Sequence, residues 1–179
     1  MAKKRKKNGG RTAFIVAATA GLIVAGLVAV MLMPTAKAKR YIPPTDPVVS
    51  DSVQTSLASL RGKVVILDFW ATWCGPCGME IPGFISLESK YKDKGLEIVG
   101  VSLDPITRKG GAAAVAPFMQ SRNINYTIWM VNNAAAMAGF DASQGIPTTY
   151  LIDRTGKVVN RYVGAQPETT FENDVKRLL

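Results

Sequence analysis

The chain of 179 residues contains no histidine and only two cysteines. Histidine is the commonest metal ligand in proteins, and its absence removes the usual partner of cysteine in zinc and copper sites. Two sulfur atoms alone provide too few ligands for such a site. Metal binding is therefore disfavoured, and we expect no metal site in this chain.

Acidic residues are absent from the first 40 positions, which carry nine of the 22 lysines and arginines. The rest of the chain has 13 basic residues against all 13 acidic ones, so it is formally neutral. The net charge of +9 is thus confined to the N-terminal segment. Because no basic surface is needed elsewhere, the pattern argues against nucleic-acid binding.

Charged residues are also missing from residues 13–33, which are almost wholly apolar. As a helix this stretch would be about 32 Å long, enough for a bilayer core of roughly 30 Å. Six basic residues precede it. The positive-inside rule then predicts a cytoplasmic basic segment over 1–12, a single transmembrane anchor over 13–33 and an extracytoplasmic remainder.

A cleaved signal peptide is the alternative, because Ala36-Lys37-Ala38 has the small-x-small form of a processing site. The apolar stretch is longer than the ~7–15 residues of a usual signal peptide, which favours an uncleaved anchor. Residues 34–47 contain four prolines and are expected to form an extended linker. Residues 48–179 are then long enough for one domain with a real core.

Hydrophobic periodicity and turn residues predict alternating strands and helices in this domain. A short strand-and-turn lead-in ends at Arg61-Gly62. The expected strands then cover Val64–Trp70, Leu96–Leu103, Thr127–Val131, Thr148–Ile152 and Val158–Val163, and the expected helices cover Pro76–Lys92, Ala113–Arg122, Asn133–Phe140 and Pro167–Leu179. The last two strands flank a turn-rich link suited to an antiparallel hairpin. The order predicts an α/β fold with a central mixed sheet and helices on both faces.

The two cysteines, Cys74 and Cys77, stand two residues apart where a strand ends and a helix begins. A dithiol at this spacing can close into a small disulfide, and helix N-terminal amides favour a thiolate at the first sulfur. Pro76 fits the first helical turn and stiffens it. A purely structural disulfide would gain little from so short a loop. The pattern therefore indicates a redox-active pair, with exposed Cys74 as attacking nucleophile and deeper Cys77 as resolving thiol.

Two acidic residues are candidates for proton transfer to and from Cys77. Asp68 interrupts the apolar run Val64–Trp70, and burial should raise its pKa. The alternative for Asp68 is a structural carboxylate that is hydrogen-bonded at the strand end. Glu80 lies three residues after Cys77 on the same expected helix, and a solvated surface charge is the alternative there.

Other residues are candidates for contacting a substrate. Trp73 adjoins the nucleophile and could line a docking surface. Pro147 precedes an apolar strand, where it is either a simple strand-starting proline or a cis residue that exposes the Ile146 backbone to an extended substrate.

Together, the motif DFWATWCGPC and the later GIPTTYLID resemble the thioredoxin superfamily across about residues 48–179. SLRGKVV before the motif, Glu80 with Pro82, and the extra strand and helix between the halves are most similar to its membrane-anchored TlpA/ResA/CcmG branch. The resemblance implies a thioredoxin fold with an N-terminal extension and a strand-helix insert, and a cis-Pro147 facing Cys74 and Cys77. It also implies that Gly75 and Pro76 belong to the client-binding surface. Asp68 stands where many relatives in this branch have Asn, and residues 141–144 lack their usual Tyr-Gly-Val.

The same resemblance implies a protein disulfide reductase on the outer side of a bacterial cytoplasmic membrane, with no cofactor other than the redox-active Cys74–Cys77 disulfide. Its clients would be apocytochrome c or copper-site subunits, and its electron donor a membrane thiol transporter of the DsbD/CcdA type. A general exchange enzyme or oxidant is the main alternative. A copper carrier would need more ligands, and a peroxidase would need a lone cysteine preceded by threonine.

Overall fold

The computed structural model describes residues 48–107 and 109–179. The predicted basic segment 1–12, anchor 13–33 and linker 34–47 lie outside the described residues. Among the described helices, none has both the length and the apolar composition needed to cross a bilayer.

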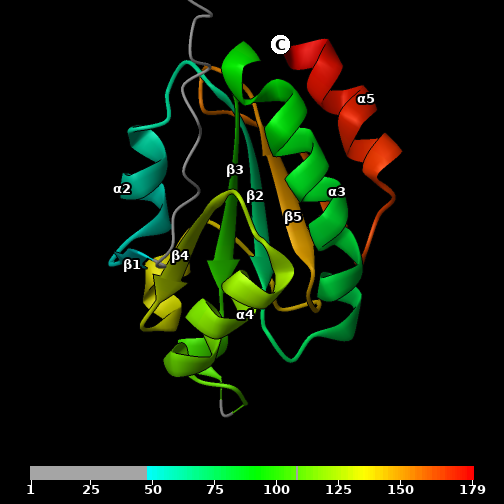
Figure 1. Cartoon of the computed structure of the whole chain (residues 1–179). Helices are drawn as coiled ribbons and strands as arrows, with labels where there is room; N and C mark the ends of the chain where they lie inside the picture. Colours follow the sequence, from blue (N-terminus) through cyan, green and yellow to red (C-terminus); the bar gives the residue numbers. More distant parts are fainter. Residues whose placement is uncertain (1–47, 108) are drawn as a thin grey trace, which may run out of the picture. The chain divides into compact units, whose positions relative to one another are not determined.

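A six-stranded mixed sheet forms the centre of the described domain (Figure 1). Its strands are β1 (Val48–Ser50), β2 (Val64–Trp70), β3 (Leu96–Ser102), β4 (Thr127–Val131), β5 (Thr148–Ile152) and β6 (Val158–Val163). They are arranged in the order β1-β4-β3-β2-β5-β6. Strand β2 is central, parallel to β3 and antiparallel to β5, and every one of its residues is buried. Apart from Asp68, its apolar sequence matches this burial on both faces.

Helices cover both faces of the sheet, as predicted. The α-helices are α2 (Val53–Ala58), α3 (Gly75–Tyr91), α4 (Val115–Arg122) and α5 (Glu168–Leu178). Short 3-10 turns are η1 (Lys92–Lys94), η2 (Asp104–Ile106), η3 (Ala112–Ala114) and η4 (Ala134–Met137). One apolar cluster joins α3, α4 and α5 to one face, and a second joins α2 and η4 to the other. Helices α3 and α5 run side by side in Figure 1.

The predicted extra strand and helix are β4 and α4. They lie in sequence between the β2–α3–β3 unit and the antiparallel β5–β6 hairpin. In the sheet, β4 sits between β1 and β3 and is parallel to both.

Two predictions need correction. The lead-in before Gly62 contains helix α2 as well as a strand, because Ser52 caps the helix by accepting the N–H of Thr55. The predicted helix Asn133–Phe140 is only the 3-10 turn Ala134–Met137. Asn133 caps this turn, and Gly139 follows with a positive φ of 90°, which ends helical geometry.

Candidate active site

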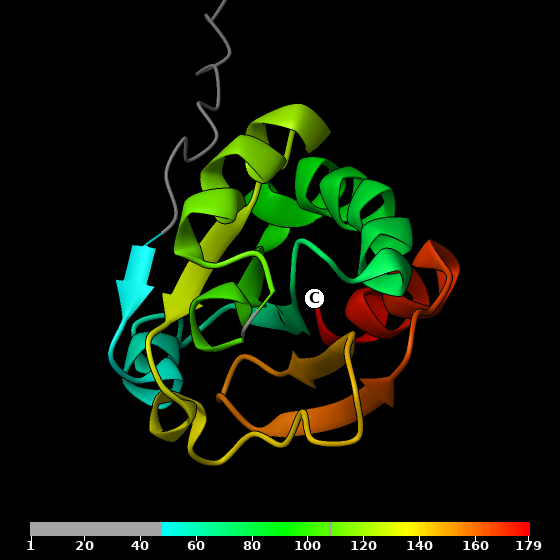
Figure 2. The ribbon, with the colours of Figure 1, turned by 90° about the horizontal axis from the view of Figure 1, so that it is seen from below.

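The dithiol lies where β2 passes into α3, at the end of the molecule seen from below in Figure 2. Cys74 is the N-cap of α3, and Pro76 occupies its first turn. The two cysteines form a disulfide with their Cα atoms 5.3 Å apart. The backbone N–H of Cys77 points at Sγ of Cys74 from 3.2 Å. A helix N-terminus with an amide aimed at the first sulfur is the arrangement that stabilises a thiolate there.

The solvent exposure of Cys74 and Cys77 differs only slightly, whereas the sequence predicted an exposed Cys74 and a deeper Cys77. Cys74 is 8% exposed and Cys77 is 1% exposed, so Cys74 is the more accessible residue but is largely covered. The prediction of an exposed Cys74 is therefore corrected, because only a small part of this residue reaches solvent. Gly75 and Pro76 beside it are exposed, and Trp73 is 41% exposed. These three predicted substrate-binding residues form a rim next to Cys74.

The loop before β5 faces the dithiol from the other side. The Ile146–Pro147 peptide bond is cis, as the resemblance implied. The carbonyl oxygen of Ile146 lies 3.6 Å from Sγ of Cys74. Pro147 is buried, whereas Ile146 is partly exposed. Chain folding thus brings together two segments that are 72 residues apart in the sequence.

Asp68 is buried in the middle of β2 with 3% of its surface exposed. Because side chains alternate along a strand, it faces the same side as Ile66 and Trp70, which is the side covered by α3. Desolvation raises the pKa of Asp68 well above its ordinary value, and the nearby Glu80 carboxylate raises it further. The Thr149 hydroxyl donates to Oδ1 over 3.0 Å and partly offsets this. A buried carboxyl group with a raised pKa is a candidate proton acceptor in catalysis.

Glu80 is buried on α3, with 4% of its surface exposed. This overturns the alternative of a solvated surface charge. Burial raises its pKa from 4.5 to about 7, although the backbone N–H of Gln166 donates to Oε1 over 2.6 Å and lowers it in part. Among the described residues, Oε2 of Glu80 has no hydrogen-bond partner. Strand β2 and helix α3, the two elements that flank the dithiol, thus each carry a buried carboxyl group with a raised pKa.

Sequence reasoning did not identify Thr149 or Gln166 as parts of this site. Thr149 sits in an ordinary strand sequence, and its role became visible only through the pairing of β5 with β2, which sets it opposite Asp68. Gln166 contributes its backbone, so no side-chain pattern could have marked it. Within residues 48–107 and 109–179, no group of three or more acidic, cysteine or histidine side chains is placed to hold a metal ion.

Comparisons with known proteins agree with this geometry. The family model described as AhpC/TSA family matches residues 34–161. Thiol-disulfide oxidoreductase ResA of a Bacillus cereus strain is 33% identical over 122 residues, covering 68% of this chain and 67% of that protein. ResA of Bacillus subtilis (strain 168) is 35% identical over 117 residues, covering 65% of this chain and 62% of that protein.

A solved structure of a thiol:disulfide interchange protein of the thioredoxin family from Chlorobium tepidum TLS matches with a TM-score of 0.60 and 28% identity. The match covers 76% of this chain and 97% of that one. The mixed sheet, the flanking helices and the dithiol at the start of α3 thus form a thioredoxin-like fold. The chain therefore belongs to the AhpC/TSA family, as a thiol-disulfide oxidoreductase of the ResA type.

Proposed function

We propose that this protein reduces specific protein disulfides outside the cytoplasm and is held at the bacterial cytoplasmic membrane by a single anchor over residues 13–33. The observation that carries the proposal is the setting of Cys74. It caps α3, receives the Cys77 N–H at 3.2 Å, and stands 3.6 Å from the Ile146 carbonyl next to cis-Pro147. A client segment lying along the Ile146 backbone would present its disulfide to this sulfur.

In the first step, the Cys74 thiolate of the reduced protein attacks one sulfur of the client disulfide. The client S–S bond breaks, a mixed disulfide forms, and the second client sulfur leaves as a thiolate that takes up a proton. The exposed residues Trp73, Gly75 and Pro76 flank Cys74 in the chain and would contact the client at this stage.

In the second step, Cys77 transfers its proton to Asp68 or Glu80, directly or through one water, and attacks Sγ of Cys74. The mixed disulfide breaks and the client leaves with both sulfurs reduced, having gained two electrons. The protein is left with the Cys74–Cys77 disulfide that the structure contains. A donor of two electrons must then restore the dithiol, and a membrane thiol transporter of the DsbD/CcdA type is the proposed source.

The direction of transfer is inferred from the residues between the cysteines. Gly75 and Pro76 carry no positive charge that would stabilise the reduced thiolate and make the pair a strong oxidant. The resemblance to the ResA branch suggests apocytochrome c before haem attachment, or copper-site subunits, as clients. A general thiol-disulfide exchange enzyme or oxidant is the competing function.

A mixed-disulfide trap tests the proposal. The Cys77→Ser variant of the full chain should accumulate a covalent client adduct on Cys74, and mass spectrometry of the adduct identifies the client. Cys74→Ser is the matched control and should trap nothing. Redox titration of the wild-type protein against glutathione tests direction, because a strongly oxidising couple would contradict the reductase assignment. Cell fractionation with protease protection tests the predicted membrane topology.

A further inference from the structure

Asp104 is another buried carboxylate, and it has no part in the mechanism above. Its side chain is fully buried. Three donors converge on it: the Thr72 hydroxyl at 2.6 Å, the Thr72 backbone N–H at 2.9 Å and the Ser102 hydroxyl at 2.9 Å. Although Asp104 begins the turn η2, its carboxylate does not cap that turn. It reaches across to the segment that leads into Cys74.

Strand register explains why these residues meet. Trp70 at the end of β2 pairs with Ser102 at the end of β3, and the N–H of Leu103 donates to the Trp70 carbonyl over 2.9 Å. The residues that follow each strand therefore emerge side by side, as Figure 2 shows for the two loops. Thr72 lies inside the turn closed by the hydrogen bond from the Cys74 N–H to the Ala71 carbonyl.

The loop after η2 packs down on the same contact. A Cβ atom at Gly110 would lie 2.4 Å from Oδ1 of Asp104 and 3.0 Å from Oγ1 of Thr72, and the φ of Gly110 is +81°. Glycine is thus required at this position both by space and by backbone conformation. The close approach shields the Asp104–Thr72 hydrogen bonds from water, which strengthens them.

The same loop also holds the indole beside the nucleophile. Nε1 of Trp73 donates to Oγ1 of Thr107 over 3.2 Å, and Nζ of Lys109 lies 5.3 Å from the centre of the Trp73 ring. Both contacts favour one orientation of the Trp73 indole, although 41% of the residue surface is exposed. Both residues before Cys74 are held by one segment that follows β3.

We propose that Asp104 is a positioning residue for thiol-disulfide exchange. By holding Thr72, it sets the turn that presents Cys74 to the Cys77 amide and keeps Trp73 at the edge of the client site. The inference rests on the proposed function in taking Cys74 as the attacking sulfur. Loss of these hydrogen bonds would let the turn move and would weaken thiolate stabilisation at Cys74, because that stabilisation depends on the direction of the Cys77 N–H.

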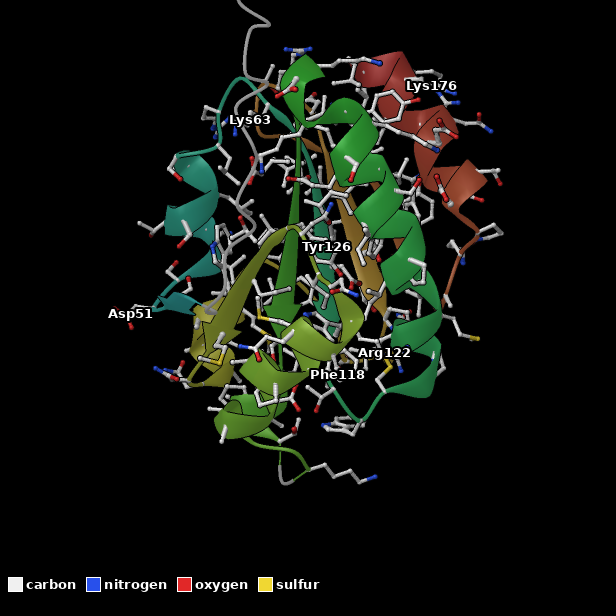
Figure 3. The ribbon with its side chains drawn as sticks, in the orientation of Figure 1. Asp51, Lys63, Phe118, Arg122, Tyr126 and Lys176 are labelled. Atoms are coloured by element: carbon white, nitrogen blue, oxygen red, sulfur yellow. A yellow bond between two sulfur atoms is a disulfide. The ribbon has the colours of Figure 1, made fainter. Side chains whose placement is uncertain are left out.

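The test compares Asp104→Asn with Glu97→Gln in the full chain. Glu97 is a matched control because it is also a buried carboxylate, on β3, that accepts from a threonine, Thr127, over 3.3 Å. Glu97 also forms an ion pair with Lys63 at 2.6 Å. Figure 3 shows Lys63 at the opposite end of the domain from Phe118 and Arg122 of α4. The measurements are the pH profile of Cys74 alkylation in the reduced protein and the steady-state reduction of insulin.

For Asp104→Asn we expect the midpoint of the alkylation profile to move upward by about half a pH unit or more and kcat/KM to fall roughly tenfold. Glu97→Gln should change thermal stability but neither of these quantities. Thr72→Val loses the hydroxyl donor but keeps the backbone N–H, so it should show the Asp104→Asn effect in weaker form. Thr72→Ser keeps both donors and should retain the wild-type alkylation profile and kcat/KM. The threonine pair keeps the test decisive even where Asp104→Asn fails to fold.

Unchanged alkylation profiles and kcat/KM in Thr72→Val, or in Asp104→Asn where that variant folds, would overturn the inference, as would an equal shift in Glu97→Gln. Failure of the proposed function is distinguishable from this outcome. In that case the wild-type protein itself fails to reduce insulin, while the difference between the alkylation profiles of the wild type and Asp104→Asn still reports whether Asp104 positions Cys74.

Discussion

The backbone N–H of Gln166 donates a 2.6 Å hydrogen bond to the Glu80 carboxylate, joining the loop before α5 to the helix that carries the dithiol. The bond lowers the pKa of Glu80, yet burial dominates and holds that pKa at about 7. A group poised near neutral pH suits transfer of the Cys77 proton, because it can both accept and release a proton under working conditions.

Glu80→Gln should flatten the pH dependence of stability. The pKa of Glu80 is raised from 4.5 to about 7, so the native state binds this proton more tightly than the unfolded state. The resulting stabilisation is complete below pH 4.5 and is lost as the pH rises to about 7. Urea unfolding at several pH values should show a loss on the order of 2 kcal/mol over this window in the wild type and a smaller loss in the variant.

Glu168→Gln provides the opposite control. Hydrogen bonds from Lys90 and Ser86 lower the pKa of Glu168, so its contribution is present above the unfolded pKa and disappears as the pH falls. That variant should lose stability at neutral pH and little at acidic pH. Identical pH dependences in wild type and Glu80→Gln would contradict the assignment of Glu80 as a buried group of raised pKa.

Asp68→Asn should slow resolution of the mixed disulfide. It should also increase the free energy of unfolding at neutral pH, because burial disfavours the charged form of Asp68. Asparagine can still accept the Thr149 hydroxyl but cannot take the Cys77 proton, and general-base removal typically costs about 10²-fold or more. The rate of mixed-disulfide decay, followed by stopped-flow mixing, should fall accordingly, whereas the rate of initial attack by Cys74 should change little. Equal decay rates in wild type and variant would restrict Asp68 to a structural role.

Trp73→Ala should weaken client binding without unfolding the protein. The side chain is 41% exposed, so its removal should change the free energy of unfolding by roughly 1 kcal/mol or less. We expect the KM for a protein disulfide to rise several-fold, on the order of 1 kcal/mol of lost contact, with reaction toward a small disulfide unchanged. Val159→Ala, an exposed apolar residue of β6 at 42%, is the matched control and should leave KM unaltered.

Gly100→Ala should destabilise the fold through overpacking. A Cβ atom there would lie 2.6 Å from Cδ1 of Ile128 and 2.8 Å from Nε1 of Trp70, inside the core between β3 and α4. The expected cost is about 1 to 3 kcal/mol in chemical denaturation. Gly78→Ala should behave in the opposite way, because no atom lies within 4 Å of its added Cβ and alanine favours the helix interior by about 0.5 to 1 kcal/mol.

Local sequence signals predicted much of this architecture. Strands β2, β4, β5 and β6 match the predicted ranges, because apolar runs bounded by turn residues define a strand without reference to the rest of the chain. The position of the dithiol at the start of α3 was also predicted from the local sequence, because Pro76 and the two cysteines lie in one helical turn. Helix α2 escaped prediction because six residues give too little periodicity, although Ser52 was an available capping signal.

The chemical state of the site depends on contacts that no local pattern contains. The raised pKa values of Asp68 and Glu80 come from burial under packed elements and, for Asp68, from the nearby Glu80 carboxylate as well. Glu80 meets Gln166 across 86 residues, and Asp104 meets Thr72 across 32. Residue type and spacing could name the nucleophile, but desolvation and long-range hydrogen bonding arise only once the chain has folded, and these set the proton affinities around it.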